Sequence, residues 1–130
     1  MVEKSQIYKC EMCGNIVEVL KVGGGELVCC GAPMVLQNEK VEEAGFTEKH
    51  LPILEQTDKG IRVKIGQIQH PMDEAHYIEW IEVKTEQNKI LRKFLNPGEL
   101  PEVEFLTHEK LIKARTYCNL HNLWSVNLKF

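Results

Sequence analysis

Two pairs of cysteines near the start of the chain set the strongest limit on how it can fold. Cys10 and Cys13 are spaced as Cys-x-x-Cys, and Cys29 and Cys30 are adjacent. Residues 1–37, which carry all four, are too few to bury a sufficient core unaided. Metal binding can supply the missing folding free energy, as it does in small zinc domains. We therefore predict that residues 1–37 form a small, metal-stabilised β domain.

The residues alone leave the metal of this first site open. Sites of four sulfurs hold zinc or iron, and the Cys-x-x-Cys knuckle turns backbone amides toward the thiolates that either metal needs. Adjacent cysteines cannot both reach one metal without distorting the tetrahedron, which an iron site can use to tune its potential. Disulfide bonds or free thiols could also account for these four cysteines.

The apolar pattern predicts strands throughout and shows no helical period. Expected strands in the first domain cover residues 7–9, 16–20, 27–28 and 34–36. After a polar, acidic linker at 38–46, they cover residues 61–65, 77–83, 90–95, 103–106, 111–117 and 123–130. Their spacing is near the ~8–12 residues typical of a β-sandwich. We predict an all-β chain in which residues 47–130 form an antiparallel β-sandwich.

Composition excludes several classes of protein. The chain has a net charge of −3, and neither of its two parts is basic. This argues against a nucleic-acid partner. No window approaches the ~20 apolar residues of a membrane span. The first six residues lack the apolar core of a signal peptide. We expect a cytoplasmic protein with no membrane partner, in which cysteines stay reduced.

Four histidines and one cysteine form a second candidate metal site. Each sits at a predicted strand end or turn, from which loops can converge on one rigid sandwich. Zinc sites close at four ligands, whereas imidazole and thiolate together suit a redox-active metal, iron above all. A lone histidine is otherwise a surface residue, the class to which we assign His108. The candidates are His50, His70, His76, Cys118 and His121.

Short motifs around these residues resemble one family. The motifs are Glu48-Lys49-His50, His70-Pro71-Met72, His76-Tyr77-Ile78-Glu79-Trp80 and Cys118-Asn119-Leu120-His121. They resemble the superoxide reductases, and nearly the whole chain resembles the two-iron class of that family, the desulfoferrodoxins. Residues 10–19 and 27–31 are similar to the desulforedoxin-like first domain of that class, and the remainder is similar to its neelaredoxin-like domain.

The resemblance implies two iron ions per chain and a redox activity. The first iron would be held by Cys10, Cys13, Cys29 and Cys30 in a distorted tetrahedron. The second would be held by the imidazoles of His50, His70, His76 and His121, with Cys118 as the axial ligand. The implied reaction is one-electron reduction of superoxide to hydrogen peroxide, with a rubredoxin-type protein as electron donor. An immunoglobulin-like sandwich and a homodimer are also implied.

The same resemblance gives catalytic roles to Glu48 and Lys49. Glu48 would close the sixth iron position in the oxidised state, and Lys49 would attract superoxide and position a proton-delivering water. Without the resemblance, both are interpreted as solvated loop charges. One position departs from the family, which usually has glycine where this chain has Asn122. Asparagine is the best substitute in a left-handed backbone, so we expect the site to be kept.

Three other functions are weighed against this enzyme. An iron electron carrier would saturate its metal, whereas five protein ligands leave a position open. A zinc-stabilised β protein fits the four cysteines but not the histidines. A mononuclear iron oxygenase would use two histidines and a carboxylate, and this chain offers too many imidazoles.

Overall fold

The chain folds into two compact units, which we describe separately. The computed structural model describes residues 2–41 and 47–128, without the side chain of Glu48. The first unit extends to Asn38 and the second begins at Glu39. Within the described residues, no helix has the length and apolar character needed to cross a membrane.

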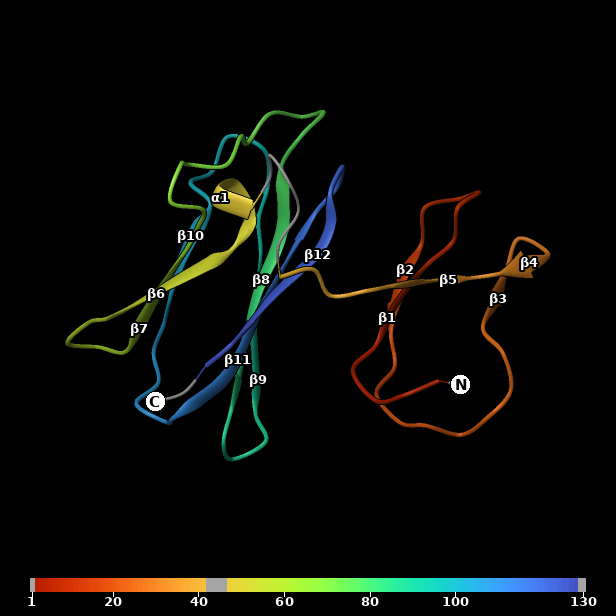
Figure 1. The fold of residues 1–130 in the computed structure, drawn as a ribbon, viewed down its shortest axis with the longest axis horizontal. Helices are drawn as coiled ribbons and strands as arrows, with labels where there is room; N and C mark the ends of the chain where they lie inside the picture. Colours follow the sequence, from red (N-terminus) through yellow and green to blue (C-terminus); the bar gives the residue numbers. More distant parts are fainter. Residues whose placement is uncertain (1, 42–46, 129–130) are drawn as a thin grey trace. The chain divides into compact units, whose positions relative to one another are not determined.

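The first unit is built from five short strands and has little core (Figure 1). A three-stranded antiparallel sheet has the order β2-β1-β5, and the other two strands pair as a hairpin. Ile7, Cys10 and Val19 are its buried apolar side chains. Such a small core agrees with a fold that depends on a metal. The strands are β1 (Ile7–Lys9), β2 (Ile16–Glu18), β3 (Val28–Cys29), β4 (Ala32–Pro33) and β5 (Val35–Gln37).

The second unit is a sandwich of two antiparallel sheets, which confirms the predicted fold class (Figure 1). One sheet has the order β10-β7-β6 and the other β12-β11-β8-β9. Its elements are α1 (Thr47–His50), β6 (Pro52–Gln56), β7 (Ile61–Ile65), β8 (Ile78–Thr85), β9 (Ile90–Phe94), β10 (Glu102–Phe105), β11 (Leu111–Cys118) and β12 (Asn122–Asn127). The four-residue helix α1 was not predicted, and neither was β6.

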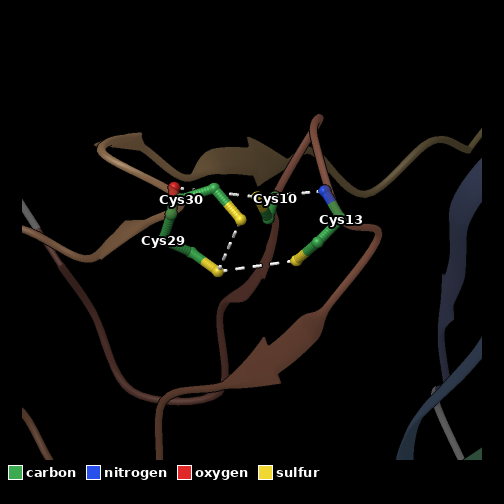
Figure 2. A group of neighbouring side chains, drawn as sticks. All are labelled: Cys10, Cys13, Cys29 and Cys30. Atoms are coloured by element: carbon green, nitrogen blue, oxygen red, sulfur yellow. Dashed lines mark hydrogen bonds between the residues drawn. The ribbon is translucent and has the colours of Figure 1, made fainter.

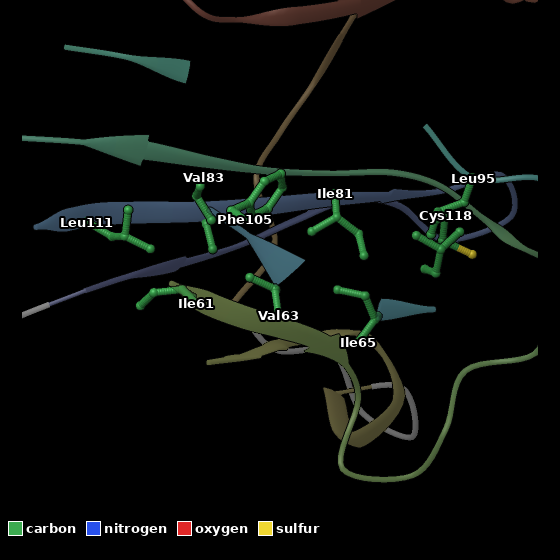
Figure 3. Packing of buried hydrophobic residues seen from close by; sticks show 11 residues of the cluster. Ile61, Val63, Ile65, Ile81, Val83, Leu95, Phe105, Leu111 and Cys118 are labelled. Carbon is green, nitrogen blue, oxygen red and sulfur yellow. The ribbon is translucent and has the colours of Figure 1, made fainter. Parts of the chain in front are cut away.

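The core lies between the two sheets (Figure 3). Alternate residues of β7, Ile61, Val63 and Ile65, point into it, as the alternating sequence of this strand predicts. β8 and β11 face them from the other sheet. β8 is buried along most of its length because it lies inside its sheet, between β11 and β9. Cys118 closes this core at the end of β11, where the site begins.

Part of the predicted linker belongs to the second unit. Lys40 lies beside β12, where its amide donates to Leu123 and its carbonyl accepts from the Ser125 amide, both at 2.9 Å. The Glu39 carboxylate pairs with Lys113 and Arg115 of β11. At least one charged residue of this polar segment, Glu39, therefore binds the sandwich through ion pairs. Residues 42–46 of the predicted linker lie outside the described residues.

Candidate metal centres

The four cysteines of the first unit come together at two turns (Figure 2). Cys10 and Cys13 flank the turn after β1, and Cys29 and Cys30 lie in the β3–β4 hairpin. Their sulfur atoms all lie within 4.8 Å of one another. The Cys13 and Cys29 sulfurs lie 3.5 Å apart, and the Cys29 and Cys30 sulfurs lie 3.9 Å apart. This is a four-sulfur donor set of the kind that zinc and iron use.

Adjacent cysteines reach the same cluster because the backbone turns left-handed at the second of them. Cys30 has a φ of 55° and Gly31 a φ of 75°. A positive φ is a sparsely populated conformation for a residue with a side chain and costs roughly 1–3 kcal/mol. The backbone of the adjacent pair is therefore strained at Cys30, while the predicted distortion of the tetrahedron around a metal stays a prediction.

Hydrogen bonds of the first site shift the pKa values of Cys10 and Cys30 in opposite directions. The Cys13 amide donates to the Cys10 sulfur at 3.5 Å, as expected of the knuckle. This bond is the main reason why the pKa of Cys10 falls to about 6. Hydrogen bonding with Cys13 and Cys10 raises the pKa of Cys30 to about 12. A bound metal would deprotonate all four, because thiolates are the coordinating form.

The second unit gathers all five of its predicted residues at one end of the sandwich. Three of them lie at the ends of secondary structure: His50 ends α1, His76 precedes β8 and Cys118 ends β11. His70 lies between β7 and β8, and His121 lies in the β11–β12 turn. Only the setting of His50 differs from expectation, since it lies on a helical turn.

The four imidazoles form a closed ring. In the order His50, His70, His76, His121, neighbouring ring centroids lie 4.6, 4.7, 5.1 and 4.8 Å apart. His50 and His76 are opposite each other, with centroids 6.5 Å apart. His50 Nε2 lies 3.0 Å from His70 Nε2 and 3.1 Å from His121 Nδ1. Ligand atoms of His50, His76, Cys118 and His121 lie within 4.8 Å of one another, and His70 adjoins this group through His50. The Cys118 sulfur lies 3.8 Å from His121 Nδ1.

Two further residues hold the loops of this site, and sequence reasoning missed both roles. The Asn119 side chain accepts from the Tyr77 amide at 2.9 Å and donates to the Ala75 carbonyl at 3.0 Å. It therefore ties the turn after Cys118 to the segment around His76. Gly66 has a φ of 85°, and a Cβ there would lie 2.7 Å from the Lys49 carbonyl oxygen. Its lack of a side chain lets α1 approach the loop that leads to His70.

Asn122 adopts the backbone conformation predicted for it. Its φ of 67° is left-handed, the conformation in which asparagine best replaces glycine.

Lys49 is exposed on α1 beside His50. The side chain of Glu48 lies outside the described residues.

The donors of the second site fit a metal. His76 Nε2 is buried and has no hydrogen-bond partner among the described residues. Buried nitrogens are nearly always paired, so an unpartnered nitrogen at this position fits the role of a metal ligand. His70 Nδ1 lies 2.7 Å from the Pro71 carbonyl, which places its proton there and leaves Nε2 free to coordinate. Burial is the main reason why the pKa of the Cys118 thiol is raised. A bound metal cation would lower that pKa, because it favours the thiolate. Imidazole with thiolate is a donor set suited to iron.

Acidification is expected to destabilise the metal-free second unit between about pH 6.5 and pH 4. Burial is the largest cause that lowers the pKa of His70 from 6.5 to about 4. The unfolded chain therefore takes up a proton before the folded protein does, and stability falls as the pH drops through this window. The loss reaches at most about 3 kcal/mol. Urea unfolding of the metal-free protein at pH 7 and pH 5, followed by tryptophan fluorescence, measures it. His70→Gln should flatten the dependence, and a flat wild-type profile would contradict the assignment.

Together, these observations define a class of protein: an all-β chain with a four-sulfur site in one unit and a four-imidazole, one-thiolate site in the other. Residues 2–37 match the family described as Desulfoferrodoxin, N-terminal domain, and residues 42–127 match Desulfoferrodoxin. The chain belongs to the desulfoferrodoxin family.

Individual relatives agree with this membership. The chain is 54% identical over 125 residues to a desulfoferrodoxin of Syntrophotalea carbinolica, a match that covers 96% of this chain and 98% of the relative. The first unit resembles the desulforedoxin of Megalodesulfovibrio gigas, with 57% identity over 37 residues that cover 28% of this chain and all of the relative. The crystal structure of the superoxide reductase from Treponema pallidum superimposes with a TM-score of 0.77 at 27% identity, covering 98% of this chain and 100% of that one.

Proposed function

We propose that this chain is a superoxide reductase, which reduces superoxide by one electron to hydrogen peroxide. The observation that carries the proposal is the closed ring of four imidazoles with the Cys118 sulfur beside it. Family membership and the superoxide reductase from Treponema pallidum support it. The chain is an oxidoreductase with two iron ions, one for each of its sites.

The donor residues divide between the two irons. Iron bound at the second site supplies the electron that superoxide takes up. The proposed ligands of the second iron are His50, His70, His76, His121 and Cys118, and those of the first are Cys10, Cys13, Cys29 and Cys30. Five protein donors leave room for one small ligand, which favours an enzyme over a saturated electron carrier.

Two residues beside His50 act on the substrate in this proposal. Superoxide is an anion, and the chain as a whole carries a charge of −3, so a local cation is needed to attract it. Lys49 is exposed and adjacent to His50, which suits this role and the positioning of a proton-donating water. Glu48, next to it in sequence, would occupy the open position in the oxidised resting state.

Metal analysis combined with rapid mixing tests the function. The purified protein should contain two irons per chain. Its reduced second centre should be oxidised by superoxide, and hydrogen peroxide should accumulate without the dioxygen that dismutation releases. Zinc at the first site with iron at the second would keep the enzyme and make the first site structural. Zinc at both sites, or no reaction with superoxide, would overturn the proposal.

Lys49→Ala is expected to slow the reaction with superoxide by roughly 10-fold and to flatten its dependence on ionic strength, because electrostatic steering gives gains of 10-fold or more that salt removes. Stopped-flow rates at low and high salt measure both effects. Lys89→Ala is the matched control, since it removes one exposed positive charge that pairs with Glu109. If the two variants show the same rate and salt slope, Lys49 does not steer the substrate.

We place the protein in the cytoplasm, where it removes superoxide with electrons from a rubredoxin-type donor. We also propose a desulforedoxin-like iron domain at residues 1–37, a linker at 38–46 whose residues 39 and 40 contact the sandwich, and a neelaredoxin-like domain at 47–130. A homodimer is supported by the exposed apolar side chains of the first unit, such as Met12, Leu20 and Val28. Sedimentation analysis of the iron-loaded protein would test the dimer.

A further inference from the structure

Trp124 contacts two of the proposed iron ligands at once. Its indole is fully buried in β12 and stacks on the His50 ring, with centroids 4.7 Å apart and planes 12° apart. Its Nε1–H donates to the His121 carbonyl at 3.0 Å. One rigid side chain thus fixes a ring from α1 and the backbone of the β11–β12 turn.

Lys40 brings a positive charge to the same indole. Its Nζ lies 5.7 Å from the centre of the Trp124 ring, within the range of a cation–π contact. The Lys40 backbone is held against β12 by hydrogen bonds to Leu123 and Ser125, so the segment that carries the charge is fixed. The Trp124 ring therefore contacts both Lys40 and His50 of the second site.

We propose that Trp124 is a positioning residue for the second centre: it fixes His50 and His121 and, with Lys40, sets the reduction potential of the iron. This inference rests on the proposed function, because it takes those histidines as iron ligands.

His50 needs such a support more than the other histidines do. It ends a helix of only four residues, and helices this short are not stable on their own. The stacked indole supplies the tertiary contact that fixes the ring orientation. Groups that orient metal ligands from outside typically change metal affinity or activity 10–100-fold when they are lost.

The positive charge of Lys40 is expected to raise the reduction potential of the second iron. The oxidised centre carries one more positive charge than the reduced centre, so a nearby cation disfavours it and raises the reduction potential. Lys40 lies close enough to act on the site: its Nζ is 5.7 Å from the centre of the Trp124 ring, and that ring lies 4.7 Å from the His50 ring. Removing that charge should lower the potential.

The chain offers a matched control for each change. Trp80, the other tryptophan, is also buried and stacked, on Tyr117 at 6.0 Å, and has Arg92 5.1 Å from its ring centre. Among the residues that the structure describes, its ring contacts are with Tyr117, Arg92 and Arg115, none of which is a proposed ligand. Lys89 is an exposed lysine whose loss changes the net charge equally.

The experiment compares Trp124→Phe with Trp80→Phe, and Lys40→Met with Lys89→Met, in the iron-loaded protein. Competition with a chelator should release iron from the second centre roughly 10-fold more readily in Trp124→Phe than in wild type, with Trp80→Phe unchanged. Redox titration should show a several-fold shift toward the oxidised form in Lys40→Met alone, where a tenfold shift corresponds to about 59 mV.

The outcomes separate this inference from the function on which it rests. If wild type holds iron and reduces superoxide but Trp124→Phe matches Trp80→Phe in iron release, Trp124 does not position the ligands. If Trp124→Phe does not fold, the Lys40→Met potential still decides: a potential equal to that of Lys89→Met overturns the inference. A wild-type protein that does not react with superoxide would instead contradict the proposed function.

Discussion

Cys118→Ser is expected to abolish the sulfur-to-iron charge-transfer absorption of the second centre and to slow superoxide reduction by more than about 100-fold, beyond what loss of an outer partner costs. Cys118 is suited to be the sulfur ligand of the second iron because it is fully buried and its sulfur lies 3.8 Å from His121 Nδ1. It is also the only cysteine after residue 30. A thiolate ligand donates electron density to iron, and serine cannot replace that donation. The visible spectrum of the oxidised protein and the stopped-flow rate measure the two effects.

Met72 supplies the control for this prediction. Its sulfur lies two residues after His70 in the chain and accepts a hydrogen bond from the Ile78 amide at 3.4 Å. Met72→Leu should keep the charge-transfer band, because the thioether is already engaged and packs on the core. A band that survives Cys118→Ser but disappears in the double variant would make Met72 the axial ligand.

Local patterns explain why much of this fold could be predicted. β7 alternates buried and less buried residues from Ile61 to Ile65, so its period of two can be read directly. α1 could not be found in this way, because four residues are too few to show a helical period. β6 was missed because several of its residues are exposed, including Ile53, and no alternation marks it.

The candidate ligands could be named from the sequence because each lies in a short motif. What those motifs could not predict is how segments distant in sequence support one another. Trp124 stacks on His50, 74 positions earlier in the numbering. Glu39, in a segment that composition marks as a linker, pairs with Lys113 and Arg115. These contacts depend on tertiary packing, which a single sequence does not display.

The buried charges on the outer face of the four-stranded sheet give the second large prediction. Glu82 and Arg115 are both 3% exposed, and the Arg115 Nη2 lies 3.1 and 3.2 Å from the two carboxylate oxygens of Glu82. Arg92 donates to the same carboxylate at 2.8 Å. Both guanidinium groups also lie near the Trp80 ring. The Glu82 carboxylate thus compensates the buried Arg115 and the partly exposed Arg92.

Glu82→Leu is expected to destabilise the second unit by about 3–5 kcal/mol, because it leaves the buried Arg115 without its main counter-charge. Glu39, 3.4 Å from Arg115, offsets only part of this loss. Both tryptophans lie in this unit, so urea unfolding followed by their fluorescence reports it directly. Glu109→Gln, which removes the exposed pair with Lys89, should cost less than about 1 kcal/mol. The double variant Glu82→Leu with Arg115→Met should recover much of the loss, since apolar replacements of a buried ion pair are often neutral. If the single and double variants are equally unstable, the cost comes from lost packing around Trp80 rather than from an unpaired charge.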